Sequence, residues 1–117
     1  MSIRKQAQTV LASAARTATV VSGIFSSEEV VFSTFSINVS AVTATPSVVF
    51  SIEGKDPLSG VFYNIIDSAA ITATGISSVL VGASINEMLP QEYRVTATHG
   101  DADSITYSVG VVHMVQN

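Results

Sequence analysis

The stretch that decides the fold is VFSTFSINVS, residues 31–40. Apolar or β-branched side chains alternate there with hydroxyl and amide side chains: Val31, Phe35, Ile37 and Val39 fall on one face, and Thr34, Ser36, Asn38 and Ser40 on the other. Successive side chains of a strand point to opposite faces. The alternation therefore predicts a strand with one buried and one solvent-facing side, and Thr45-Pro46 predicts its end.

The same alternation recurs in residues 47–54, with an inner face made of Val48, Phe50 and Ile52. Residues 55–60 then hold turn signals, with Asp-Pro at the start and Gly60 near the exit. A second short β-rich run follows at residues 61–66. The two runs and their turn predict a β-hairpin.

Two further alternating runs lie near the C-terminus, at residues 92–99 and 104–115. Their aligned apolar positions are Tyr93, Val95 and Ala97 in the first run, and Ile105, Tyr107, Val109 and Val111 in the second. The turn residues 100–103 lie between them. We expect these two strands to form a second hairpin.

The remaining segments carry weaker signals. Residues 69–75 and 76–82 predict two short extended pieces, and residues 83–90 an irregular stretch or a short helical turn that Pro90 closes. Residues 12–15 resemble one helical turn, and residues 17–21 a strand. The whole chain thus predicts an all-β fold, a single-domain β-sandwich over residues 1–117 with about seven or eight short antiparallel strands. Both jelly-roll and immunoglobulin-like topologies remain open.

Composition narrows the class of protein. The 117 residues suit one domain, and 12% charged residues is about half the share usual in globular domains. A net charge of −4 argues against nucleic-acid binding by bulk charge, and the absence of Cys excludes a disulfide scaffold. Arg4 and Lys5 imitate the start of a signal peptide, but no apolar run follows, so no export is expected. Residues 1–10 are instead a candidate extended arm.

A search for chemistry finds no catalytic, metal-binding or cofactor-binding group. No nucleophile elbow, zinc motif or glycine-rich phosphate loop is present. His99 and His113, the two histidines, would not lie opposite each other in a hairpin, so a metal site is not expected. Asp101 and Asp103 suit a turn better than a calcium loop, and Glu28-Glu29 suits a solvated turn.

The three tyrosines and Arg94 leave alternatives open. Tyr63, Tyr93 and Tyr107 would form a stacking platform for sugars or single strands if exposed, but without basic residues between them we favour core and core-edge positions. Arg94 lies on a polar strand face. Its partner is either another molecule or one of the nearby carboxylates, Glu53, Asp56 and Asp67.

Two motifs resemble a family of small tailed-bacteriophage virion proteins. These are GKDPLSG, residues 54–60, and THGDADSITYSV, residues 98–109, within stretches 39–75 and 93–110. The resemblance implies a non-enzymatic structural protein of the virion, of the head decoration or cement kind. It implies the major capsid protein and further copies of the chain, as a homo-oligomer such as a trimer, as partners. It also implies synthesis in the host cytoplasm and a final place on the capsid surface, with no cofactor, nucleic acid or membrane partner.

Two alternatives accompany this hypothesis. A tail or head–tail junction subunit belongs to the same structural class. A β-sandwich that binds carbohydrate or a host surface through exposed Tyr and Asp side chains belongs to another. An enzyme is not expected, because no catalytic constellation is found.

Overall fold

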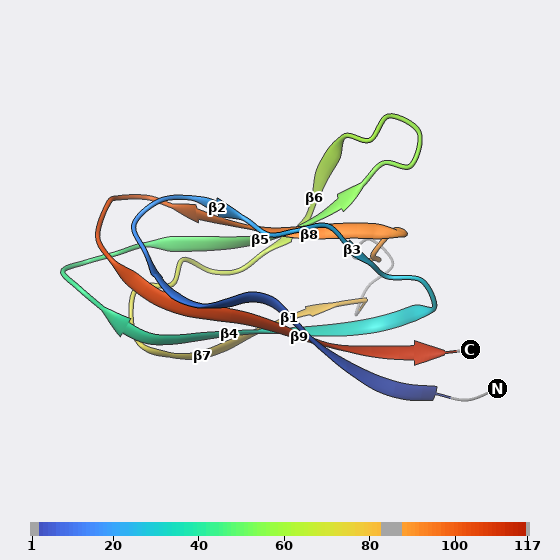
Figure 1. Cartoon of the computed structure of the whole chain (residues 1–117), viewed down its shortest axis with the longest axis horizontal. Coiled ribbons are helices and arrows are strands. Elements are labelled where there is room, and N and C mark those ends of the chain that lie inside the picture. The colour runs from blue at the N-terminus through green and yellow to red at the C-terminus, as the bar shows by residue number, and fades with distance from the viewer. Residues whose placement is uncertain (1–2, 83–87, 117) are drawn as a thin grey trace.

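The computed structural model describes residues 3–82 and 88–116, and these residues form nine strands and no helix. The strands are β1 (Ile3–Arg16), β2 (Val20–Val21), β3 (Phe25–Ser26), β4 (Val30–Val42), β5 (Val48–Lys55), β6 (Phe62–Asp67), β7 (Gly75–Val81), β8 (Glu92–His99) and β9 (Ile105–Gln116). They form two antiparallel sheets that face each other (Figure 1). The predicted all-β sandwich is confirmed.

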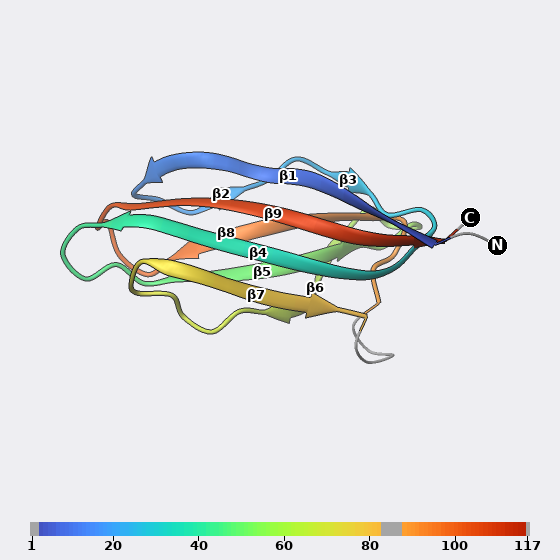
Figure 2. The ribbon, with the colours of Figure 1, turned by 90° about the horizontal axis from the view of Figure 1, so that it is seen from below.

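Sheet A has the strand order β1-β9-β4-β7, and sheet B has the order β2-β8-β5-β6, with β3 also paired to β8. Three strands of sheet A, β1, β4 and β9, run along much of the molecule, and β7 is shorter (Figure 2). The outer strand of sheet B beside β8 consists of two short pieces, which pair as Val20 with Ala97 and as Phe25 with Tyr93. Sheet B is therefore the less continuous of the two.

The ladders are nested along the chain. β5 pairs with β6, β4 with β7, β2 and β3 with β8, and β1 with β9. One long hairpin whose two arms roll up together gives this nesting, and its innermost turn is the one between β5 and β6. Eight strand positions paired this way across two sheets form a jelly roll, so the choice left open by the sequence resolves to that topology.

The core lies between the two sheets and is made by the inner faces predicted from alternation. All of the aligned positions are buried: Phe35, Ile37 and Val39 in β4; Val48, Phe50 and Ile52 in β5; Tyr93, Val95 and Ala97 in β8; Ile105, Tyr107, Val109 and Val111 in β9. Val31 is the exception, at 49% exposed. An irregularity in the β4–β9 register between Val30 and Phe32 shifts the alternation there.

The predicted β5–β6 hairpin is confirmed, and Gly60 takes φ 76° at its turn, a conformation that glycine adopts without strain. The predicted hairpin between β8 and β9 is wrong. β8 belongs to sheet B and β9 to sheet A, so residues 100–104 cross from one sheet to the other. A tight return and a crossing between sheets use the same turn residues and the same alternation, which is why the pattern did not separate them.

The N-terminal segment also differs from expectation. Residues 12–15 belong to β1 and not to a helical turn, and of residues 17–21 only Val20–Val21 is a strand. Residues 3–10, the described part of the candidate arm, are paired with β9 from Ile3 opposite Gln116 to Thr9 opposite Gly110. Here the positions on the inward side are the polar Arg4, Gln6 and Gln8, opposite Val115, His113 and Val111, and all three are exposed.

Two further predictions concern the segment between β6 and β8. Residues 69–75 do not form a strand of their own, although Ile71 makes an isolated bridge to Val48, and β7 begins at Gly75. Of the stretch expected to be irregular or helical, residues 83–87 lie outside the described residues. Gly54 lies on the inner side of β5 against Pro90, where an added Cβ would come within 2.7 Å of the proline ring.

Candidate interaction surfaces

The two histidines lie in different sheets, and each meets a tyrosine of the opposite sheet. His113 of β9 lies with its Nε2 atom 2.9 Å from the hydroxyl of Tyr93 in β8, and with its Nδ1 atom 2.6 Å from the hydroxyl of Ser33 in β4. All three side chains are buried. Buried polar groups stabilise a fold when each has a hydrogen-bond partner, so this cluster joins the two sheets through the core.

The protonation of this cluster follows from its burial. Burial lowers the pKa of His113 and raises the pKa of Tyr93, so both are neutral near pH 7. A neutral imidazole has one donor and one acceptor nitrogen, which matches its two hydroxyl partners. Ser33 and His113 have the spacing of a nucleophile and its base, but Ser33 is 0% exposed, so no substrate reaches it.

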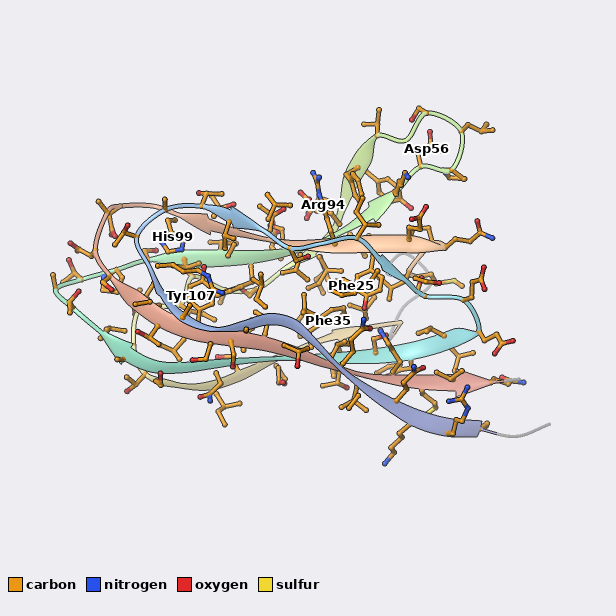
Figure 3. The ribbon with its side chains drawn as sticks, viewed as in Figure 1. Phe25, Phe35, Asp56, Arg94, His99 and Tyr107 are labelled. Carbon is orange, nitrogen blue, oxygen red and sulfur yellow. The ribbon has the colours of Figure 1, made fainter. Side chains whose placement is uncertain are left out.

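A second tyrosine–histidine pair joins the sheets at the other end of β8 (Figure 3). His99 Nε2 lies 2.9 Å from the hydroxyl of Tyr107. Arg16 of β1 lies over the Tyr107 ring, 4.6 Å from its centroid, and donates a hydrogen bond of 2.8 Å to the backbone carbonyl of Tyr107. Burial lowers the pKa of His99, while the nearby charge of Asp101 opposes that shift.

The predicted turn residues form turns. Asp101 Oδ1 accepts a hydrogen bond from the backbone N–H of Asp103, and Asp103 Oδ2 accepts one from the backbone N–H of Thr45. Glu28 and Glu29 are exposed, and Glu29 has a turn conformation with φ 65°. Within residues 3–82 and 88–116, no group of three or more His, Asp or Glu side chains is placed to hold a metal ion.

Two of the three tyrosines lie in the core, as predicted, and the third is on the surface. Tyr93 and Tyr107 are 0% exposed, and each packs edge to face on a phenylalanine of the opposite sheet, Phe35 and Phe50 respectively. Tyr63 is 46% exposed on β6. The three rings therefore do not form a common stacking platform.

The outer face of sheet B is polar. Four of its charged side chains form two ion pairs, while Asp67 of β6 is exposed and makes no ion pair within the described residues. Arg94 Nε lies 2.7 Å from Glu53 Oε1, which also accepts a 2.8 Å hydrogen bond from Thr96. The Arg94 guanidinium lies 3.9 Å from the centroid of the Phe62 ring. Lys55 forms a longer ion pair with Glu92, at 3.4 Å. Of the alternatives left open for Arg94, the structure shows the contact with Glu53.

The outer face of sheet A is nearly free of charge. The register of the four strands aligns their outward side chains in rows that run across the sheet. One such row is Ala7, Val112, Thr34 and Leu80. Among all such outward positions in the paired segments, Lys5 is the one charged residue that the structure describes. The other positions carry apolar, hydroxyl or amide side chains or glycine. The alternation of residues 31–40 already put only uncharged side chains on its outer face, but it did not show which strands lie beside this one.

The β5–β6 hairpin extends beyond the sandwich (Figure 1). The Asp56 carboxylate organises its tip by accepting hydrogen bonds from the backbone N–H groups of Leu58 and Ser59 and from the Ser59 hydroxyl. The Ser59 hydroxyl and these N–H groups lower the pKa of Asp56. Leu58 is 96% exposed at this ordered tip.

Together these features define the class: a jelly-roll β-sandwich whose buried polar groups join the two sheets and whose outer faces differ in charge. The protein is similar in fold to a chain of the structure of infectious bursal disease virus, Gx strain, with a TM-score of 0.61 and 9% sequence identity. The match covers 98% of this chain and 33% of that chain, so this protein spans about a third of its length. At this identity the likeness shows the fold alone.

No known protein family matches the sequence, and no curated protein does either. These comparisons do not show the tailed-phage resemblance of residues 54–60 and 98–109. The described residues contain no helix that is long and apolar enough to cross a membrane.

Proposed function

We propose that this protein is a non-enzymatic structural subunit of a virus particle. The observation that carries the proposal is the similarity of nearly the whole chain, 98%, to part of a chain in a virus structure with a TM-score of 0.61. Jelly rolls are a recurrent architecture of viral capsid domains, although lectins and cupins share it. Fold alone does not assign function, so the surface supplies the second support.

The chemistry of the chain suits a subunit that acts by contact. The Ser33–His113–Tyr93 cluster is sealed in the core, and the charges of Glu53 and Arg94 are paired with each other. The outer face of sheet A is nearly uncharged, which favours packing against other subunits because little charge must be desolvated. These features support a binding role for the surface of the sandwich.

Within this class we propose a decoration or cement subunit of a tailed-phage head, which stabilises the shell by contacts with the major capsid protein and with further copies of itself. The finer assignment rests on the GKDPLSG and THGDADSITYSV motifs, residues 54–60 and 98–109. A tail or head–tail junction subunit is the alternative in the same class. The carbohydrate-binding hypothesis has less support, because Tyr93 and Tyr107 are buried.

Quantitative mass spectrometry of purified particles tests the proposal. A head decoration subunit is present in hundreds of copies per particle, and a tail or junction subunit in few. Complete absence of the chain from purified particles would overturn both structural assignments. Glycan-array binding that is lost on Tyr63→Ala would favour the carbohydrate hypothesis instead.

A further inference from the structure

We infer that the outer face of sheet A is the surface through which two copies of this chain contact each other. The inference rests on the proposed function in one respect, since it names a second copy as a partner of a structural subunit. The geometry behind it comes from the outward rows of β1, β9, β4 and β7.

The first argument is the arrangement of knobs and hollows around Val112. This side chain is 44% exposed at the middle of the face, on the central strand β9. On one side of it lies an open hollow of about 350 Å³ lined by Lys5, Phe32, Thr34 and Met114. On the other side lies a shallow, open hollow of about 340 Å³ over Gly110, which has no side chain to fill the row between Thr9 and Ser36.

A projecting side chain beside a hollow on the same face makes that face complementary to itself. When two copies meet about a two-fold axis, the Val112 side chain of each copy enters a hollow of the other, so a single patch serves as both partners. This is the isologous contact that most soluble homodimers use. Leu80, 46% exposed, and Ile76, 75% exposed, add apolar area on the β7 side.

The second argument is charge. Two copies of a face whose one outward charge is Lys5 meet without a buried ion pair and without loss of existing pairs. Docking the same face onto sheet B would instead cover Glu53 and Arg94, whose desolvation is unfavourable. A partner that binds through ion pairs would find only Lys5 on this face. The uncharged surface thus favours another copy of itself.

The third argument is area. Strands lie about 4.8 Å apart and rise about 3.3 Å per residue, so three strands over the twelve residues of β9 and the seven residues of β7 present a face of at most roughly 680 Å². Stable interfaces bury about 800 Å² on each partner. The face alone is therefore about as large as a specific dimer contact.

Sedimentation equilibrium of the purified chain tests the inference with matched variants. Val112→Glu places a carboxylate in the middle of the contact, and Thr98→Glu places the same charge at an exposed outward position of sheet B. We expect the unsubstituted chain to dimerise, Val112→Glu to raise the Kd of dimerisation by more than about a hundredfold, and Thr98→Glu to leave it unchanged. Circular dichroism checks that both variants are folded.

A reporter that does not depend on Val112→Glu folding is available because the chain contains no cysteine. Ser36→Cys on the sheet A face should react slowly with a maleimide when the chain is concentrated and rapidly when it is dilute, whereas Thr98→Cys should react rapidly at both concentrations. A chain that stays monomeric at high concentration overturns the inference. The inference is also overturned if Thr98→Glu weakens self-association as much as Val112→Glu does, or if the two cysteines react equally.

The inference and the proposed function can fail separately. A monomeric chain found in particles would contradict this inference alone, and a sheet A dimer absent from particles would contradict the proposed function alone.

Discussion

The two outer faces of the sandwich are built on one shared core but differ in chemistry. On sheet B, Arg94 and Thr96 both donate hydrogen bonds to Glu53 and Arg94 covers Phe62, so these three polar side chains are already partnered within the chain. On sheet A, apolar and hydroxyl side chains surround one charge, Lys5. Because the fold needs inner faces and not outer ones, this difference supports the contact that we propose for sheet A.

The largest expected effect tests whether the two faces do share one core. Phe35→Ala removes an inner side chain of sheet A, and Phe50→Ala removes one of sheet B; each ring packs edge to face on a tyrosine of the other sheet. Both substitutions should lower the free energy of unfolding by about 3–5 kcal/mol, measured by urea unfolding. A large loss for one and none for the other would contradict a common core.

The next prediction concerns the histidine that links the sheets. An unfolded histidine has a pKa of about 6.5, and burial holds the pKa of His113 below that value. Below pH 6.5 the unfolded chain therefore binds a proton that the folded chain does not. The free energy of unfolding should be greatest above about pH 6.5 and should fall as the pH drops from there toward 5.

Urea unfolding between pH 5 and 8 measures this dependence. His113→Gln keeps hydrogen-bonding capacity without a titrating ring, so its stability should vary less with pH in this range than that of the unsubstituted chain. His99→Gln is the matched comparison at the other tyrosine–histidine pair. An identical fall with pH in the His113→Gln chain would show that His113 does not cause it.

A smaller change in the free energy of unfolding should distinguish the two outer faces directly. Glu53→Gln removes the charge that partners Arg94 on a partly buried part of sheet B. We expect a loss of about 1 kcal/mol in the free energy of unfolding, since both groups keep some contact with water. Lys5→Gln on sheet A should leave stability unchanged, because no ion pair of Lys5 is observed within the described residues. Equal losses from the two substitutions would remove the contrast between the faces.

The smallest effect is expected at the protruding hairpin, outside both faces. Asp56→Ala removes the acceptor of the Leu58 and Ser59 N–H groups. Amide hydrogen exchange should accelerate at these two positions, while exchange in β4 and β9 and the thermal midpoint should stay as they are. Faster exchange throughout sheet A would show that the tip supports the whole fold.

Alternation predicted the central strands well, because β4, β5, β8 and β9 are each covered on one side by the opposite sheet. It failed for the first half of β1, whose inward positions Gln6 and Gln8 are polar and exposed and so carry no apolar alternation. It also failed between β8 and β9, since local turn residues do not encode which sheet the chain enters next. Strand existence is a local property, whereas sheet membership depends on the nested pairing of the whole chain.

The contacts of the polar side chains were likewise predictable only where both partners are close in sequence. The turn role of Asp101 was predictable because its bond to the Asp103 N–H group spans two residues, whereas the bond of the Asp103 carboxylate to the Thr45 N–H group joins distant segments and was not. The pairing of Tyr93 with His113 and of His99 with Tyr107 was not, because it depends on how two sheets lie over each other. The uncharged outer face of sheet A was missed for a related reason. Residues 31–40 show an uncharged outer side, but the sequence does not show that three other strands extend it.

A reconstruction of the assembled particle tests the central claim most directly, because it shows what covers each face. The account predicts density for this chain in many copies, with the sheet A faces of paired copies in contact around Val112 and with Arg94 and Glu53 of sheet B open to solvent. Density in which sheet B is covered and the sheet A face is bare would contradict it.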